Sequence, residues 1–217
     1  MSMLARKICS ASGASTPQDF TFVGVSFPSS NMDIQVPSGS QAGDIAIAYS
    51  STATGPAPTV YSGFTQIASV DSTFEDMFQY KILTSQDLTT TFTRQPDLYD
   101  TAIMVTFRPA NPVTSLTVTS ANPSYIVQTS LTPYSQYFST SQGNGPSILI
   151  GTYSSYQTEP YITGSFWDGN YLNQGENNNY IKMYYRIFSD SSNAGYVQAG
   201  GDYGSYNIMM SCVINES

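Results

Sequence analysis

The fold is decided by Ile47-Ala48-Tyr49-Ser50-Ser51, which the chain repeats about 105 residues later as Ile150-Gly151-Thr152-Tyr153-Ser154-Ser155. Two more segments recur in the same order: Phe78-Gln79-Tyr80-Lys81-Ile82-Leu83 as Met183-Tyr184-Tyr185-Arg186-Ile187-Phe188, and Ile103-Met104-Val105-Thr106 as Ile208-Met209-Met210-Ser211. All three are apolar and have the length of β-strands. Three matches in one order indicate that the chain contains two related halves, at about residues 36–110 and 146–214.

Short apolar segments alternate with turn residues along most of the chain. Residues 20–27 alternate between two faces in the two-residue period of a strand, and Pro37-Ser38-Gly39 begins a turn. No segment combines the 3.6-residue period of a helix with capping residues. We predict strands at residues 20–27, 33–37, 45–49, 64–70, 76–83, 89–93, 101–108, 116–119, 125–128, 147–153, 162–167, 180–188, 195–199 and 207–214. This spacing predicts an all-β fold, an antiparallel jelly-roll-like β-sandwich.

The domain organisation follows from the number of strands in each half. Residues 1–20 lack periodicity and are interpreted as an N-terminal arm, and residues 139–146 have the composition of a linker between the halves. Each half offers only about five strands, and a sheet needs a second sheet to cover its apolar face. We therefore favour a single β-sandwich domain over residues 21–217, built from two related halves, over two tandem domains.

The composition excludes several classes of partner. Only 10% of the residues are charged, against about 25% in an average globular chain, while Ser and Thr make up about a quarter of the sequence. Nucleic-acid binding is not expected, because the net charge is −8 and the seven basic residues are scattered. No apolar run approaches the ~18 residues of a membrane span. Such a composition is typical of extracellular and particle-surface proteins.

The residues that most enzymes use are missing or dispersed. The chain has no histidine, which excludes Ser-His-Asp triads and His-ligated metals, and it has no nucleotide-binding glycine motif. Its carboxylates fall mostly in expected loops, where a solvated acid is the default. Asp168-Gly169-Asn170 with Glu176 and residues 177–179 offers oxygen ligands for Ca²⁺, but the spacing is not that of an EF-hand and a polar turn is favoured. We predict no catalytic residue, no metal site, no cofactor and no enzymatic activity.

Aromatic residues gather between Tyr153 and Tyr180, together with a run of Asn and Gln. The candidate ligand or interface residues are Tyr156, Tyr161, Phe166, Trp167 and Tyr171. Aromatic rings with amide groups suit carbohydrate recognition, because sugar C–H faces stack on rings while hydroxyls need polar partners. The same residues are enriched at subunit interfaces, and a partly buried Trp in a long loop is a third interpretation. All three stay open.

Cys9 and Cys212 are the only cysteines. They could form a disulfide between the two ends of the chain, although a buried side chain and a chance thiol are the commoner outcome for two lone cysteines. Residues 1–15 contain Arg6 and Lys7 but no apolar core of a secretory signal, so no export signal is expected.

The first half carries an ordered set of strand and turn elements. They are Val36-Pro37-Ser38-Gly39, Gly43-Asp44-Ile45-Ala46-Ile47-Ala48, Pro56-Ala57-Pro58, Ser62-Gly63-Phe64-Thr65-Gln66-Ile67, Tyr80-Lys81-Ile82, Thr91-Phe92-Thr93 and Ile103-Met104-Val105-Thr106-Phe107-Arg108. This set resembles the tail-fibre-like and particle-surface β-sandwich proteins of tailed bacteriophages. The resemblance covers residues 36–108, and the second half only through the repeat. Phe64 departs from it, since the family more often has Trp there.

The resemblance implies a non-enzymatic structural protein of the virion, in a tail or fibre-type appendage. A head decoration protein and a carbohydrate-binding module are the alternatives. The expected partners are other virion proteins, further copies of the chain in a symmetric homo-oligomer, and a host-surface polysaccharide. A protein with a surface-type composition and no export signal fits synthesis in the host cytoplasm and location in the virion.

Overall fold

The computed structural model describes residues 20–29, 33–52, 59–70, 75–93, 100–127, 134–137, 146–156, 161–163, 168–174, 179–188, 196–200 and 206–216. Regular structure in these ranges is almost entirely antiparallel β-strand, with one short 3-10 helix, η1 (Asp87–Thr89). The predicted all-β, sandwich-like class is confirmed. No helix in the described ranges is long and apolar enough to cross a membrane.

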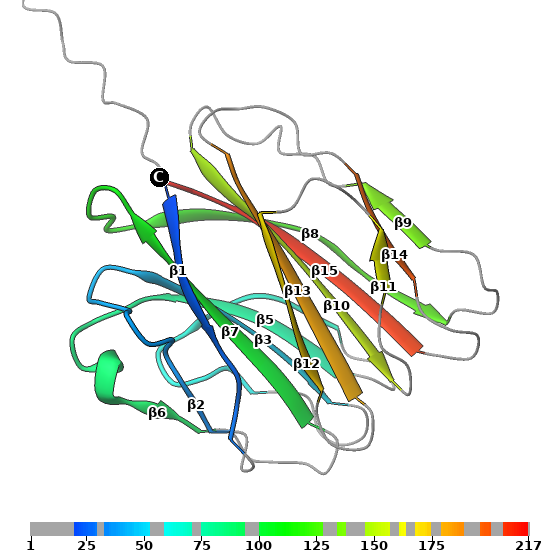
Figure 1. The fold of residues 1–217 in the computed structure, drawn as a ribbon, viewed down its shortest axis with the longest axis horizontal. Helices are drawn as coiled ribbons and strands as arrows, with labels where there is room; N and C mark the ends of the chain where they lie inside the picture. Colours follow the sequence, from blue (N-terminus) through cyan, green and yellow to red (C-terminus); the bar gives the residue numbers. More distant parts are fainter. Residues whose placement is uncertain are drawn as a thin grey trace, which may run out of the picture.

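Each half of the chain forms one five-stranded sheet (Figure 1). The N-terminal sheet has the order β1 (Phe20–Ser26), β7 (Asp100–Pro109), β3 (Ile45–Thr52), β5 (Glu75–Ile82) and β4 (Thr65–Val70). The C-terminal sheet has the order β8 (Leu116–Val127), β15 (Tyr206–Glu216), β10 (Ser147–Tyr156), β13 (Asn179–Phe188) and β12 (Gly169–Gln174). In both sheets the strands lie in the same order: first, fifth, second, fourth and third along the chain. The repeat is therefore also a repeat of topology.

Two smaller sheets follow the same duplication. β2 (Ile34–Gln35) pairs with β6 (Thr91–Phe92), while β9 (Tyr134–Tyr137) pairs with β14 (Tyr196–Gly200), which also pairs with β11 (Tyr161–Thr163). β2 and β9 each follow the first strand of their half, and β6 and β14 each precede the last strand. The accessory pair thus occupies the same place in both halves.

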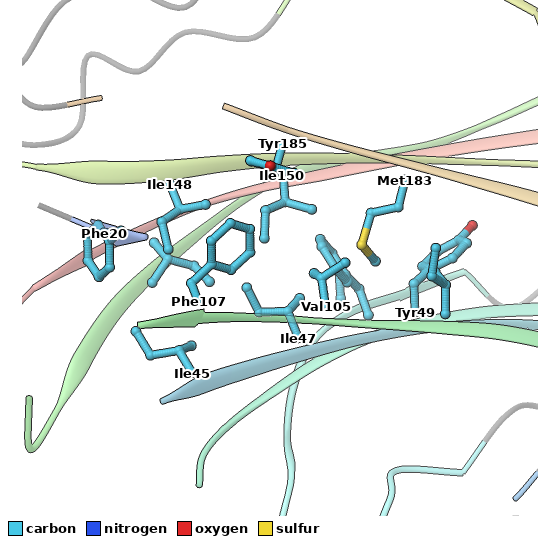
Figure 2. Packing of buried hydrophobic residues seen from close by; sticks show 14 of the residues in the cluster. Phe20, Ile45, Ile47, Tyr49, Val105, Phe107, Ile148, Ile150, Met183 and Tyr185 are labelled. Atoms are coloured by element: carbon cyan, nitrogen blue, oxygen red, sulfur yellow. The ribbon is translucent and has the colours of Figure 1, made fainter. Parts of the chain in front are cut away.

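The hydrophobic core lies between the two five-stranded sheets. In Figure 2 the side chains of Ile47 and Val105 point from the N-terminal sheet toward Ile150 and Met183 of the C-terminal sheet. All four are fully buried. Burying an aliphatic side chain of this size stabilises the fold by about 1.5–3 kcal/mol, so this shared core holds the two halves together.

A second apolar cluster covers the other face of the N-terminal sheet. Ala46, Ala48 and Met104 of that face pack under Ile34 of β2 and Phe92 of β6, and Tyr61, Phe64 and Leu83 complete the cluster. β3 is therefore buried on both faces, and all of its residues are buried. This explains why Ile45-Ala46-Ile47-Ala48-Tyr49 is continuously apolar instead of alternating.

The strand register corrects the alignment of the repeat. Ile47 lies opposite Tyr80 and Ile150 lies opposite Tyr185, so these pairs are equivalent, as the sequence suggested. Two residues further along, Tyr49 lies opposite Phe78, whereas Thr152 lies opposite Met183. The structural counterpart of Tyr49 is thus Thr152. The sequence match with Tyr153 is one residue out of phase, and a one-residue shift moves a side chain to the other face of the sheet.

The last strand of each half is shifted as well. Ile103 lies opposite Tyr49, and the residue opposite Thr152 is Met210. Met210, and not Ile208, is therefore the counterpart of Ile103.

Three strands differ from the sequence prediction. The segments expected at 116–119 and 125–128 are one strand, β8, which passes through Pro123. Proline is tolerated there because β8 is an edge strand, and the β8–β15 register shifts between Met209 and Ser211, next to this point. β9 and β12 were not predicted. β12 is rich in Asn and Gly, and its pairing with β13 overrides a weak local strand preference.

Parts of the predicted organisation lie outside the described residues. These are residues 1–19 of the arm and residues 139–145 of the linker. Phe20, placed at the end of the predicted arm, is the first residue of β1 and belongs to the core.

Candidate functional site

Three of the five predicted aromatic site residues lie on described strands, one on each of β10, β11 and β12. Tyr156 ends β10 and pairs with Asn179, and Tyr171 lies in β12 beside Met183, so both are in the C-terminal sheet. Tyr161 begins β11 in the small three-stranded sheet and pairs with Gly200. Phe166 and Trp167 lie outside the described residues. The stretch from Tyr153 to Tyr180 is therefore partly strand, and its role as a binding site stays a prediction.

Asp168, the first residue of the stretch considered for Ca²⁺ binding, makes hydrogen bonds to backbone groups of β13. Its carboxylate accepts a hydrogen bond of 2.7 Å from the Ile187 amide, and its own amide donates to the Tyr185 carbonyl at 3.0 Å. Both contacts hold the start of β12 against β13. Among the described residues, no group of three or more Asp, Glu, Cys or His could hold a metal ion.

The elements that carry the phage resemblance are tied together by an ion pair. Arg108 donates two hydrogen bonds of 2.9 Å to the carboxylate of Asp44, which is 1% exposed, and a third to the Gly39 carbonyl. The hydrogen bonds and charge of Asp44 raise the pKa of Arg108. Gly39 and Gly43 adopt φ values of +89° and +92°, which L-residues rarely adopt. The pair fixes the turn before β3 to the end of β7.

A second ion pair fixes the turn after β5. Lys81 Nζ lies 2.7 Å from Asp87 Oδ1 and 5.5 Å from the centre of the Phe92 ring. Asp87 also accepts hydrogen bonds from the amide and hydroxyl of Thr84. Burial alone would raise the pKa of Asp87, but the hydrogen bonds from Lys81 and Thr84 outweigh burial and lower it. These contacts hold the turn against β5 and β6.

A fully buried carboxylate lies between the two large sheets. Asp76 of β5 accepts hydrogen bonds from the hydroxyls of Tyr49 and Ser154, the latter at 2.7 Å. Burial raises the pKa of the Tyr49 hydroxyl well above its ordinary value, and the nearby charge of Asp76 raises it further. A buried carboxylate with a perturbed neighbour is a feature of many active sites. Here the acid is enclosed in the core, so its position fits a structural link.

An open pocket of about 720 Å³ lies where β1 ends, beside β2 and β6. We call it the β1–β2 pocket. Its lining combines hydroxyl, amide, carboxylate and apolar groups, from Ser26, Phe27, Pro28, Ser29, Asp33, Gln35, Val36, Pro37, Ser38, Gly39, Ser40, Leu88 and Thr91.

The walls of this pocket are held by hydrogen bonds between its own strands. Ser26 Oγ donates to the Gln35 carbonyl at 2.6 Å, and Gln35 Nε2 donates to Thr91 Oγ1 at 3.0 Å. The Ser29 amide donates to the Asp33 carbonyl at 2.8 Å. β1, β2 and β6 are thereby joined around the pocket.

Sequence reasoning missed this pocket, although one signal was present. Phe27-Pro28 ends the first strand with an aromatic residue, directly before the residue that stops it. The sequence could not place Leu88 and Thr91 beside it, because they lie about 60 positions further along the chain.

Comparison of this chain with family models, with curated proteins and with solved structures finds no match.

Proposed function

We propose that this protein is a non-enzymatic structural component of a bacteriophage virion, present in symmetric copies in a tail or fibre-type appendage. The proposal includes its location in the virion and contacts with other virion proteins. It rests on the resemblance over residues 36–108 and on what those residues do in the fold.

The observation that carries the proposal is the Asp44–Arg108 pair. Both residues belong to the elements of the resemblance, and they are 64 positions apart in the chain. Their contact joins the turn before β3 to the end of β7, and Arg108 also reaches Gly39. Three elements of the resemblance, those that contain Gly39, Asp44 and Arg108, are thus fastened to one another. A pattern fixed by such contacts is expected to mark a shared scaffold.

The polar groups of the described core support a structural role as well. Asp44, Asp76 and Asp87 are buried, and each is engaged by hydrogen-bond donors of the fold itself. A catalytic carboxylate must instead reach a substrate. The buried acids therefore fit a framework better than an active site.

Electron microscopy of intact particles tests the proposal directly. Particles from lysed host cells are labelled with an antibody against this protein, or the protein is located in a particle reconstruction. We expect regular copies on the tail or its fibres. Regular copies on the head would assign the alternative, a decoration protein. Protein found only in the soluble extract, and never on particles, would remove the proposal.

A further inference from the structure

We propose that the β1–β2 pocket binds a saccharide that is neutral or carries an amine. The inference deepens the host-surface binding expected of the proposed function, but it places the binding site away from the Tyr153–Tyr180 stretch. Four features of the pocket lead to it: exposed apolar groups, acceptor-rich walls, the sign of its charge, and its rigidity.

The first feature is the exposed apolar surface. Among the described residues, three large hydrophobic side chains are exposed: Phe27 at 42%, Val60 at 37% and Leu88 at 36%. Two of these three line the same pocket: Phe27, directly after β1, and Leu88 of η1. An exposed ring offers a face on which the C–H groups of a sugar can stack.

The second feature is a surplus of hydrogen-bond acceptors. Ser26 uses its O–H and Gln35 one of its two side-chain N–H groups for bonds within the pocket walls, which leaves the side-chain Oε1 of Gln35 and the hydroxyl lone pairs of Ser26 as acceptors. The Asp33 carboxylate adds two more acceptor oxygens. A ligand with many O–H donors satisfies such walls, and a sugar has a hydroxyl on most of its carbons.

The third feature is charge. Among the described residues of the lining, Asp33 is the ionisable one, and none is Lys or Arg. The whole chain carries −8. A phosphate, sulfate or carboxylate on the ligand would find no Lys or Arg to pair with among these described lining residues, and Asp33 would repel it. Neutral sugars fit, and an amino sugar gains the attraction of the carboxylate.

The fourth feature is rigidity. The turn that forms one wall is fixed by the bond from Arg108 to the Gly39 carbonyl. On the other side, β1 passes so close to Pro37 that a Cβ placed on Gly24 would lie 3.1 Å from the Pro37 Cβ. A preformed site loses little entropy on binding. Its volume lies within the ~300–1,000 Å³ of ordinary ligand pockets, enough for a short oligosaccharide.

The test is binding of the purified full chain to defined glycans. The probes are an array carrying neutral hexose oligomers, chitosan oligomers and sulfated oligomers, with affinities then measured by titration calorimetry. We expect neutral or amine-bearing oligomers to bind and sulfated ones to be rejected. Phe27→Ala should weaken binding at least tenfold. Asp33→Asn should weaken binding of chitosan oligomers more than that of neutral ones.

Val60→Ala is the matched control, because Val60 is equally exposed but lies outside the pocket lining. Thermal denaturation shows that each variant is folded. The inference is overturned if no glycan binds, if sulfated oligomers bind best, or if Phe27→Ala binds as well as Val60→Ala. Self-association that Phe27→Ala abolishes, without glycan binding, would make the pocket a subunit interface and would also overturn it. Because this assay uses purified protein, its failure is distinct from failure to find the protein on particles.

Discussion

Ser154 of β10 donates a 2.7 Å hydrogen bond to Asp76 of β5 across the interior of the sandwich. Ser154 is equivalent to Ser51 by register, and Asp76 is equivalent to Ile181. The polar link is therefore not duplicated: one half provides a buried acid where the other provides a buried isoleucine. It is a specific polar contact between the two halves within their shared core.

Ser154→Ala should destabilise the protein by about 1–3 kcal/mol, because it removes a hydrogen bond to a buried carboxylate. Urea unfolding at neutral pH measures the loss. Ser69→Ala is the control, since the Ser69 bond to Gln66 is exposed and its loss should cost less than about 0.5 kcal/mol. In a double-mutant cycle with Asp76→Asn the two losses should not add. Additive losses would show that the two residues act independently.

Alkaline solution should unfold the protein through its buried tyrosines. Burial raises the pKa of both Tyr49 and Tyr184, with Asp76 adding to the first and Tyr153 to the second. A raised folded-state pKa means that stability is fully present below the unfolded tyrosine pKa of about 10 and is lost as the pH rises above it. Above that pH, each such tyrosine should lower the free energy of unfolding by about 1.4 kcal/mol for every further pH unit.

Urea unfolding between pH 9 and 12, with tyrosinate absorbance as a second signal, measures this slope. Tyr49→Phe should be less stable at pH 8, yet lose less stability per pH unit above 10. An unchanged slope in both Tyr49→Phe and Tyr184→Phe would contradict the assignment.

In acid, Asp87 should contribute to unfolding. The pKa of this carboxyl is lowered by Lys81 and Thr84 against the effect of burial. A lowered folded-state pKa gives stability that is present above the unfolded aspartate pKa of about 4 and is lost as the pH falls below it. Asp87→Asn should flatten the acid limb of the stability curve. Lys81→Met should flatten it only in part, because the Thr84 bonds remain. Equal acid limbs in all three proteins would refute this.

Gly63→Ala should lower the free energy of unfolding more than Gly43→Ala does. Both glycines have positive φ, +78° and +92°, so alanine strains the backbone by about 1–2 kcal/mol at either position. A Cβ at position 63 would also lie 2.7 Å from Lys81 Nζ, whereas nothing lies within 4 Å of a Cβ at position 43. The difference between the two variants in urea unfolding isolates the displacement of Lys81 from Asp87. Equal losses would mean that Lys81 moves aside at no cost.

Gly169→Ala should disturb the aromatic contact that joins the sheets beside β1. The Tyr185 ring stacks on Phe22 with centroids 4.7 Å apart and meets Phe107 edge-on at 5.1 Å. A Cβ on Gly169 would lie 2.5 Å from this ring, which its neighbours hold in place. We expect a loss of about 1–3 kcal/mol, in the range of overpacked cores. Replacing the Tyr185 ring by the smaller leucine side chain in Gly169→Ala/Tyr185→Leu removes this clash and should restore part of the lost stability. A double variant less stable than Gly169→Ala would contradict a clash with the ring.

Most strands could be predicted because their signals are local. Residues 20–27 alternate by side chain, and Gly39, Gly43 and Gly63 mark turns that need positive φ. β12 could not be predicted, since its polar sequence becomes a strand only by pairing with β13. The β1–β2 pocket could not be predicted for the same reason, because its walls come from segments that are far apart in the chain.

The sequence by itself determined that this chain is all-β and built from two related halves. Periodicity and turn residues depend only on neighbouring residues, and the repeated order of segments can be found by comparing the sequence with itself. The tertiary structure alone decided that Tyr49 corresponds to Thr152 and that Asp76 reaches Ser154. Register assigns every side chain to a face through pairing with distant strands, so a shift of one residue, invisible in the sequence match, decides which groups meet in the core.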